Sequence, residues 1–496
     1  MRYIPEDKEP KDVLRYFEEI CAIPHGSYHV DQISNYLVNF AKDHKLRFEQ
    51  DAEKNVIIFK DGSKGASKDP IILQGHMDMV LEKNQNVTRD LTKQPIELRC
   101  DGDTLYADGT TLGGDDGIAV AMMLAALADK KLEHPPLECI FTTNEETGME
   151  GVNALDVSDL KGRRMINLDS EEEGIFTVGC AGGAQEEITL GFERKPRYGV
   201  GLHLEISGLR GGHSGASIHL GRANANVIMT RLLNRIYRKI PFCLYDFEGG
   251  TRDNAIPRSA AADLVFPEDY DSSLVKKVMD KFEKQMANEY RYTDPDIKLT
   301  YSRTDYSDLA VSAVGRKDTR KIIALLMSLP NGLIERDPQI RDMPQSSLNM
   351  GVVRTNTDNL SVVYLVRSSI NSQKKFLVDR LRSITWLAGG QIVTISEYPA
   401  WERVQDSPLV AELSALFEKE NGKKPVISIT HGGLECGLLA SKIKGLDCVS
   451  IGPDMSGVHT PDEKVSISSV ERTWKFLTAA LSDMAEAGGK EEKESE

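Results

Sequence analysis

Short apolar segments alternate with helical segments over the first 170 residues, and this alternation restricts the fold more than any other feature. The strand-like segments are residues 55–59, 71–74, 137–143 and 165–168, and residues 113–130 form a glycine turn that leads into an apolar helix. Strands that alternate with helices usually form a parallel sheet with helices on both faces. We therefore predict an α/β domain with a mostly parallel central sheet flanked by helices.

The pattern changes near Cys180, at the glycine-rich GCAGGAQEE, and returns near Trp401. Between these positions, strand-like segments such as 202–206 are mixed with helical segments such as 223–238, which indicates an α+β unit. A chain of 496 residues is also too long for one compact core. We therefore predict at least two domains.

Composition narrows the class of protein. The net charge of -15 and the pI of about 5.3 argue against a nucleic-acid-binding surface. The first residues do not form a signal peptide, and the longest apolar stretch, 118–128, is too short to span a bilayer. Seven scattered cysteines without a C-x-x-C motif are typical of reduced thiols, so we expect a cytoplasmic protein without membrane association. The charged residues 487–496 are predicted to be a disordered tail.

His76 and Asp78 follow an apolar strand in the motif Gly-His-Met-Asp. Residues two apart in an extended chain face the same side, so Asp78 can accept a hydrogen bond from one ring nitrogen of His76 while the other binds a metal ion. Taken alone, an H-x-D pair is more often an ordinary surface or core histidine.

Two pairs of adjacent acids are further candidates. Asp115 and Asp116 lie between glycines before the apolar helix, where they can cap the helix or where one carboxylate can bridge two cations. Glu145 and Glu146 end an apolar strand. A two-metal hydrolase would use one of them as a ligand and the other to take a proton from metal-bound water, whereas a solvated turn is the alternative.

Asp169 follows another apolar strand, and His459 lies in Gly-Val-His-Thr. Neither is informative alone, but with the other clusters they make a set of two histidines and three or four carboxylates, which suits a divalent ion such as zinc. Ligands gather at the carboxyl ends of strands in α/β sheets. The H-E-x-x-H, G-x-S-x-G and P-loop motifs are absent from the sequence.

The sequence resembles the aminoacyl-histidine dipeptidases, also called cytosol non-specific dipeptidases, within the superfamily of co-catalytic zinc aminoacylases, carboxypeptidases and dipeptidases. The resemblance runs from IPHGSYH at Ile23 to HTPDEKVSISSVERTW at His459. The stretches that carry it are LQGHMDMV, DGTTLGGDDGIAVA, TTNEETGMEG, NLDSEEEG, GLRGGHSG, RDNAIPR, THGGLECGLL and GPDMSGVHTPDE.

This resemblance implies a di-zinc metallopeptidase that hydrolyses unblocked dipeptides, Xaa-His and others, with cobalt or manganese as alternatives to zinc. Asp115 would bridge the two ions, Glu145 would be the general base, and Asp78 would orient His76. The peptide bond after Asp115 would be cis. The implied metal ligands are His76, Asp115, Glu146, Asp169 and His459.

The resemblance also implies a lid and dimerisation domain, residues 186–399, inserted into a catalytic domain formed by residues 1–185 and 400–496. His213 of this lid would polarise the scissile carbonyl and stabilise the oxyanion, and in related homodimers it comes from the partner subunit. Asn254 and Arg367 would position the substrate, the latter through its terminal carboxylate. An ordinary surface position on a strand is the alternative for Arg367. Two further residues would line the same end of the pocket: His431 and Gly432.

Two other functions fit part of the pattern. An N-acyl amino acid deacylase or a tripeptidase of the same superfamily would use the same metal site with a different pocket. A non-catalytic metal or peptide binder would retain the scaffold, although a binder has no need of the base Glu145.

Overall fold

The structure is a computed structural model that describes residues 3–306 and 310–494. The chain divides into two compact units, which are described separately. Unit 1 comprises Met1–Gly179, Arg403–Ile429 and Leu434–Glu496, and unit 2 comprises Cys180–Glu402 and Thr430–Gly433. In the sequence, unit 2 is therefore inserted into unit 1.

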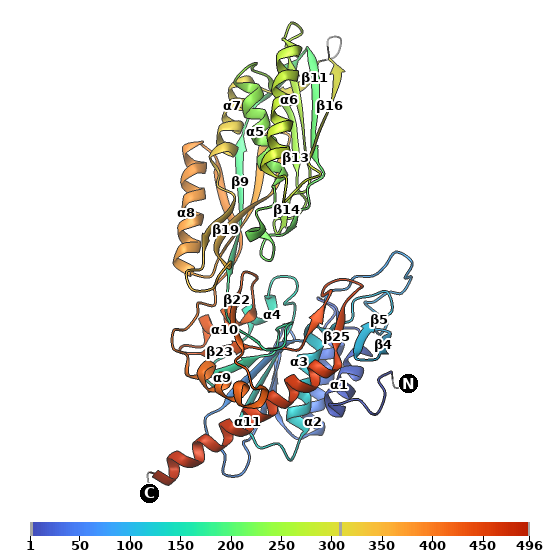
Figure 1. Cartoon of the computed structure of the whole chain (residues 1–496), viewed down its shortest axis with the longest axis vertical. Coiled ribbons are helices and arrows are strands. Elements are labelled where there is room, and N and C mark those ends of the chain that lie inside the picture. The colour runs from blue at the N-terminus through green and yellow to red at the C-terminus, as the bar shows by residue number, and fades with distance from the viewer. Residues whose placement is uncertain (1–2, 307–309, 495–496) are drawn as a thin grey trace. The chain divides into compact units, whose positions relative to one another are not determined.

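Unit 1 is built on an eight-stranded sheet (Figure 1). Its strands, in spatial order, are β1 (Arg47–Gln50), β2 (Val56–Lys60), β6 (Leu137–Thr142), β3 (Ile71–His76), β7 (Arg164–Asn167), β23 (Asp447–Ser450), β8 (Ile175–Cys180) and β22 (Val426–Thr430). The central strands β6, β3, β7 and β23 are parallel, whereas β1, β2 and β8 pair antiparallel with their neighbours. The predicted α/β class is confirmed, and the sheet is mixed, with its parallel strands at the centre.

Helices cover the central strands of unit 1. Every residue of β3 and β6 is buried, as expected for strands whose two faces are both covered. Helix α3 packs on β3, α2 on β2, and α9 and α10 on β23. The helices of the unit are α1 (Lys11–Cys21), α2 (Asp31–Asp43), α3 (Gly114–Ala128), α4 (Glu150–Ala154), α9 (Pro408–Asn421), α10 (Glu435–Lys442) and α11 (Ile467–Glu494).

A second, smaller sheet of unit 1 joins distant parts of the sequence. Its strands, in order, are β24 (Met455–Ser456), β25 (Lys464–Ser466), β5 (Thr104–Ala107) and β4 (Leu98–Asp101), all paired antiparallel. These strands are short and lack long apolar runs, so the sheet was not predictable from the sequence. The sheet places the segment that carries His459 beside the segment that precedes α3.

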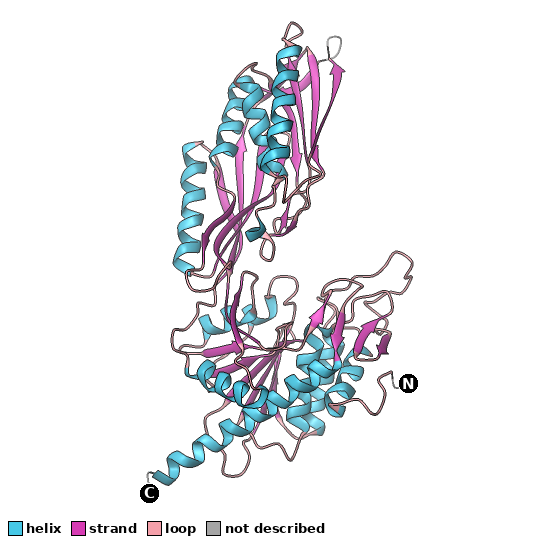
Figure 2. Ribbon diagram, viewed as in Figure 1, coloured by secondary structure: helices cyan, strands magenta, loops and turns pink. Residues whose placement is uncertain are grey.

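Unit 2 is an antiparallel sheet with helices packed against it (Figure 2). In order, its strands are β16 (Lys298–Asp305), β11 (Val200–Ser207), β15 (Ala260–Phe266), β13 (Cys243–Gly249), β19 (Pro344–Thr355), β20 (Asn359–Ser368), β9 (Gly182–Gly191) and β21 (Gln391–Tyr398), and β18 (Gly332–Arg336) also pairs with β19. The helices are α5 (Ala225–Tyr237), α6 (Ser272–Glu289), α7 (Arg316–Ser328), α8 (Asn371–Leu387) and the 3-10 turn η1 (Ile218–Leu220). Two strand pairs lie outside the sheet: β10 (Arg194–Arg197) with β17 (Val311–Val314), and β12 (Gly212–His213) with β14 (Ala255–Ile256).

The core of unit 2 lies between this sheet and its helices. Ile228, Leu232 and Phe282 from the helices and Leu204 and Tyr364 from the strands are fully or almost fully buried in one apolar cluster. This is the α+β architecture predicted for the inserted region.

The C-terminal segment predicted to be disordered begins at residue 487. The structure continues α11 as far as Glu494, and residues 495–496 lie outside the described residues. Glutamate and lysine predominate after Gly489, and both are good helix formers. Among the described helices, none combines the length and apolar character needed to cross a bilayer.

Candidate metal centre

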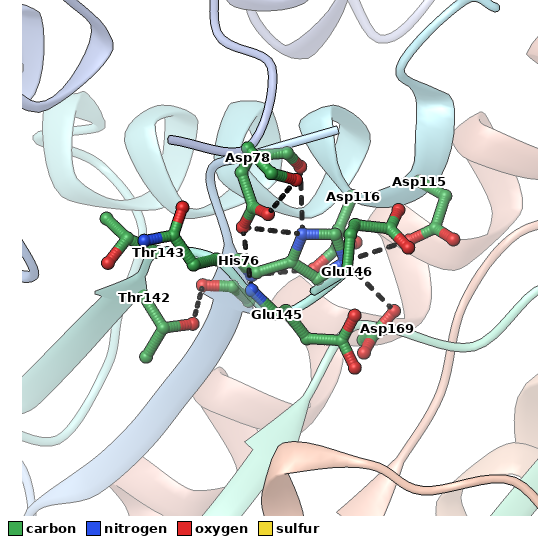
Figure 3. Close-up of polar contacts among 12 residues, drawn as sticks. His76, Asp78, Asp115, Asp116, Thr142, Thr143, Glu145, Glu146 and Asp169 are labelled. Atoms are coloured by element: carbon green, nitrogen blue, oxygen red, sulfur yellow. Dashed lines mark hydrogen bonds and ion pairs between the residues drawn. The ribbon is translucent and has the colours of Figure 1, made fainter. Parts of the chain in front are cut away.

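The predicted site residues of unit 1 meet at one edge of the central sheet. His76 lies opposite Thr142, and Gln74 lies opposite Asn167, so the parallel strands β3, β6 and β7 end side by side. The residues that follow these strands are therefore neighbours: Asp78, Glu145, Glu146 and Asp169 (Figure 3).

His76 presents one ring nitrogen to the acids of this edge. Its Nδ1 lies 2.9 Å from the backbone carbonyl oxygen of Asp78 and 3.6 Å from the Asp78 carboxylate. Because a carbonyl oxygen only accepts, Nδ1 is the donor. Nε2 then faces Asp115 Oδ1 at 3.0 Å and Asp169 Oδ1 at 3.7 Å. Nε2 is therefore the nitrogen that can bind a metal ion.

Asp78 ties His76 to the next strand end. This almost fully buried carboxylate accepts hydrogen bonds from Ser27 Oγ at 2.8 Å and from the backbone N–H of Glu145 at 3.1 Å. Burial raises the pKa of Asp78, but His76, Ser27 and Glu145 outweigh this effect and lower it. The ionised carboxylate thus holds the Glu145 backbone close to His76.

Asp115 lies between two imidazoles. Its Oδ1 faces His76 at 3.0 Å, and its Oδ2 faces His459 Nε2 at 3.2 Å. The residue stands at the start of α3 with non-helical backbone angles (φ -81°, ψ 106°), and its peptide bond to Asp116 is cis, as the family resemblance implied. Burial raises the pKa of Asp115, but hydrogen bonds to His459 and His76 lower it below its ordinary value. One carboxylate is therefore aimed at both histidines.

Glu146 and His459 form the other side of the cluster. His459 Nε2 lies 2.8 Å and 2.9 Å from the two carboxylate oxygens of Glu146. Burial lowers the pKa of His459, but the neighbouring Asp115 and Glu146 raise it to about 11. Glu146 thus contacts His459, whereas Asp169 contacts His76.

The residues present fit divalent metal ions. Among the described residues, three groups each offer ligand atoms that lie within 4.8 Å of one another. They are His76 with Asp116 and Asp169, His76 with Glu145 and Glu146, and Asp115 with Glu146 and His459. Burial and neighbouring carboxylates raise the pKa of Glu145, Glu146 and Asp169 above ordinary values, although His76 opposes this in each case. Such crowded acids repel one another unless cations are bound. Imidazole and carboxylate donors are those that zinc and similar ions prefer.

Asp116, the second acid of the pair that it forms with Asp115, lies next to the backbone of His76. Its Oδ2 accepts a hydrogen bond from the backbone N–H of His76 at 3.2 Å, and its buried Oδ1 has no hydrogen-bond partner among the described residues. Gly75 makes room for it, because a Cβ atom there would lie 2.5 Å from Asp116 Oδ2. Glycine at position 75 therefore avoids a steric clash with the Asp116 side chain.

A buried polar network that was not predicted from the sequence lies beneath the candidate metal centre. Glu435 Oε2 accepts hydrogen bonds from Gln74 Nε2 and Thr142 Oγ1, both at 2.5 Å, and Gln74 Oε1 accepts one from Asn167 Nδ2 at 2.6 Å. The network connects β3, β6 and β7 just before they end. Glu435 lies in the motif THGGLECGLL, but its partners are about 300 or more residues away, so no local signal could reveal them.

A second group of predicted residues gathers within unit 2. His213 Nδ1 accepts hydrogen bonds from the backbone N–H groups of Gly215 and Ala216, both at 3.2 Å. Buried His431 contacts Ser347 Oγ through Nε2 at 2.8 Å. Burial lowers the pKa of His431 to about 3, and the nearby positive charges of Arg367, His219 and His213 contribute. The structure thus brings His213, Arg367 and His431 together.

Three other contacts complete this group. Arg367 is almost fully buried and donates from Nη1 to the Tyr398 hydroxyl at 2.8 Å. The backbone carbonyl of Asn254 accepts a hydrogen bond from the backbone N–H of Ser214. Asn254 and His213 also line the same groove of unit 2. The carbonyl of Gly432 accepts one from the N–H of Ala181.

The chain matches a known family of proteins. Residues 72–483 match peptidase family M20/M25/M40. This chain belongs to that family, whose members include peptidases with the fold described above.

Two relatives match nearly the whole chain. The cytosol non-specific dipeptidase of Escherichia coli (strain K12) is 38% identical over 478 residues, which cover 96% of this chain and 98% of the relative. The aminoacylhistidine dipeptidase of Vibrio alginolyticus has a solved structure that is 35% identical, covers 96% of this chain and 97% of that chain, and superimposes with a TM-score of 0.86. The predicted family and its metallopeptidase class are confirmed.

A more distant structure shares the fold alone. The aminopeptidase PepT of Bacillus cereus ATCC 10987 is 16% identical, with a TM-score of 0.54 over 96% of this chain and 99% of that chain.

Proposed function

We propose that this chain is a metal-dependent dipeptidase that hydrolyses unblocked dipeptides, Xaa-His among them. Both relatives that match nearly the whole chain are dipeptidases by name, one of them for aminoacyl-histidine substrates. The observation that carries the proposal is the position of Asp115, with one carboxylate oxygen 3.0 Å from His76 and the other 3.2 Å from His459. This is the arrangement that a bridging ligand of two ions requires.

Two divalent ions, zinc by preference and cobalt or manganese as alternatives, would be held by the acids and histidines of unit 1. Asp169 would complete the His76 side, Glu146 the His459 side, and Asp115 would be shared. When bound, the ions supply Lewis-acid chemistry, which polarises the scissile carbonyl and makes a water molecule nucleophilic near neutral pH.

Glu145 would be the general base. It takes a proton from the attacking water and then gives that proton to the nitrogen of the leaving amino acid. Its backbone N–H is bound to the carboxylate of Asp78, whose backbone carbonyl also binds His76 Nδ1. Asp78 therefore sets the distance between the base and the His76 imidazole.

His213 would stabilise the oxyanion of the tetrahedral intermediate. Since its Nδ1 accepts two backbone N–H groups, a neutral ring carries its proton on Nε2. Nε2–H is then a donor of the kind an oxyanion hole requires. In the homodimer we propose, this histidine comes from the partner subunit, and residues 186–399 form the lid and dimerisation domain.

Arg367 would bind the terminal carboxylate of the substrate. Its guanidinium is almost fully buried, and its Nε has no hydrogen-bond partner among the described residues. Buried donors without partners are costly, and a carboxylate satisfies them. Asn254 and Gly432 would line the same pocket.

Metal analysis coupled to a substrate panel tests the function. We expect two ions per chain and hydrolysis of dipeptides such as β-alanyl-histidine that a chelator abolishes and added zinc restores. The panel also includes tripeptides and N-acetyl amino acids, and preferential turnover of either would show a tripeptidase or a deacylase instead. Light scattering tests the homodimer, and fractionation of the source cells tests the cytosolic location that the name of the E. coli relative suggests.

Replacement of the base separates catalysis from metal binding. Glu145→Gln should lower kcat by at least about 10²-fold, the usual contribution of a general base, while the metal content stays at the wild-type value. Glu150→Gln, on the exposed start of α4, is the matched control and should retain full activity. Full activity of Glu145→Gln would refute the role of Glu145 as the general base. If the wild type itself hydrolyses none of the substrates, the protein is a non-catalytic binder.

A further inference from the structure

Glu463 makes an unusual set of contacts with the turn that carries Asp115. One carboxylate oxygen accepts the backbone N–H groups of Leu112 and Gly113 at 2.7 Å and 3.2 Å. The other accepts those of Gly114 and Asp115 at 2.8 Å and 3.4 Å. The side chain of Glu463 is almost fully buried, so water does not compete for these amides. A single carboxylate therefore binds four consecutive amides.

Two of these amides, those of Gly114 and Asp115, are the first of α3, and the other two lie just before it; the helix has no side-chain cap of its own. The N-cap residue is Gly113, which has no side chain to offer and adopts a left-handed conformation (φ 74°). The first N–H groups of a helix lack partners within the helix and favour a negative charge nearby. Glu463 supplies that charge from about 350 residues further along the chain.

Gly114, immediately before Asp115, allows this close approach. A Cβ atom on Gly114 would lie 2.4 Å from Val465 Cγ2 and 3.2 Å from Glu463 Oε1. The turn and the segment around Glu463 are thus packed against each other, and a side chain on Gly114 would push them apart.

Glu463 also belongs to the segment that carries His459. The two are four residues apart, and the N–H of Glu463 donates to the carbonyl of Thr460, whose own N–H donates to Gly457, both at 3.1 Å. This turn makes the segment compact. Glu463 therefore connects His459 directly to the backbone of Asp115.

We propose that Glu463 is a positioning residue that holds the carboxylate of Asp115 between His76 and His459, so that the metal affinity of the centre depends on it. The inference rests on the proposed function, because it takes Asp115 and His459 as metal ligands. Each carboxylate oxygen of Glu463 already accepts two backbone N–H groups, so Glu463 would act through Asp115 and not as a ligand itself.

Glutamine at position 463 has nearly the same shape as glutamate but only one accepting oxygen. A carboxylate has two accepting oxygens, whereas a carboxamide has one, and its NH2 group would face two N–H donors. We therefore expect Glu463→Gln to lose two of the four hydrogen bonds to the backbone of residues 112–115. Changes that disturb the support of a metal ligand typically lower metal affinity by about 10- to 100-fold.

Glu138 on β6 offers a matched control. Its buried carboxylate likewise accepts backbone N–H groups, those of Lys161 at 2.9 Å and Gly162 at 3.0 Å. Glu138 is near the start of the strand that ends before Glu145, and it touches none of the proposed ligands. Glu138→Gln should therefore lower thermal stability as Glu463→Gln does but leave metal affinity unchanged.

The experiment is a titration of metal-free full-length protein with zinc against a competing chromophoric chelator, below the Tm of each variant. We expect Glu463→Gln to bind zinc about 10- to 100-fold more weakly than the wild type and Glu138→Gln to bind as the wild type does. Equal zinc affinities of Glu463→Gln and the wild type would overturn this inference and leave the proposed function standing. So would equal losses in both variants. If the wild type binds no zinc, the proposed function fails and this inference fails with it.

A second pair of variants tests the same contact if Glu463→Gln does not fold. Gly114→Ala should weaken zinc binding by pushing Val465 and Glu463 away, and Val465→Ala added to it should restore part of the affinity by making room. Wild-type zinc affinity in Gly114→Ala, or no recovery in the double variant, would overturn the inference.

Discussion

Glu435 provides a test of how burial controls the charge of a carboxyl group beneath the candidate metal centre. Its side chain is completely buried, one oxygen accepts hydrogen bonds from Gln74 and Thr142, and the other has no partner among the described residues. Burial raises the pKa of Glu435 to about 7, and Asp78 contributes to the rise, while His76 and the two hydrogen bonds oppose it.

The change is Glu435→Gln. The amide oxygen of glutamine can keep both hydrogen bonds, and its NH2 group would replace the oxygen that has no partner. In the wild type, the folded pKa of about 7 lies above the ordinary value of 4.5, so folding favours the protonated acid. The contribution of Glu435 to stability is therefore fully present below pH 4.5 and is lost as the pH rises through 7.

The magnitude follows from the two pKa values. The difference between 4.5 and about 7 corresponds to about 3 kcal/mol of folding free energy. We expect Glu435→Gln to gain stability over the wild type by up to this amount between pH 4.5 and pH 8.

The assay is urea unfolding of the metal-free proteins at several pH values, because bound metal would add its own stabilisation. Glu150→Gln, on an exposed position, controls for the loss of one negative charge and should differ little from the wild type at any pH. A difference between Glu435→Gln and the wild type that does not change with pH would refute the reasoning.

Three further predictions concern packing, metal and substrate. Gly75→Ala should lower the free energy of unfolding by about 1–3 kcal/mol in a urea titration, because the new Cβ would lie 2.5 Å from Asp116 Oδ2 and 2.9 Å from Ala119 Cβ, whereas Gly191→Ala, with open space around it, should not. Zinc at about 100 times its Kd should stabilise the wild type by about 2.7 kcal/mol in thermal unfolding, and an unchanged Tm would contradict a folded-state metal site. Arg367→Lys should raise KM for dipeptides about tenfold with a smaller change in kcat, since lysine cannot form the bidentate pair, and an unchanged KM would place the carboxylate elsewhere.

The order of elements could be predicted because it depends on local patterns. Apolar runs such as those of β3 and β6 predict buried strands, and the apolar run after Asp116 predicts α3. The directions of the outer strands were not predictable in this way. An apolar strand has the same pattern whichever way it runs, so the antiparallel pairing of β2 with β6 depends on contacts between distant segments.

By itself, the sequence determined the class of fold, the family and the set of acids and histidines at the strand ends, because each depends on residues close together in the chain. Only the tertiary structure decided which oxygen of Asp115 faces His76 and which faces His459, and that Asp169 contacts His76 whereas Glu146 contacts His459. It also decided that Glu463 binds the amides of residues 112–115 and that Glu435 binds Thr142. The contacts of His459, Glu463 and Glu435 join residues about 300 or more positions apart, and their geometry exists only once the segments have packed together.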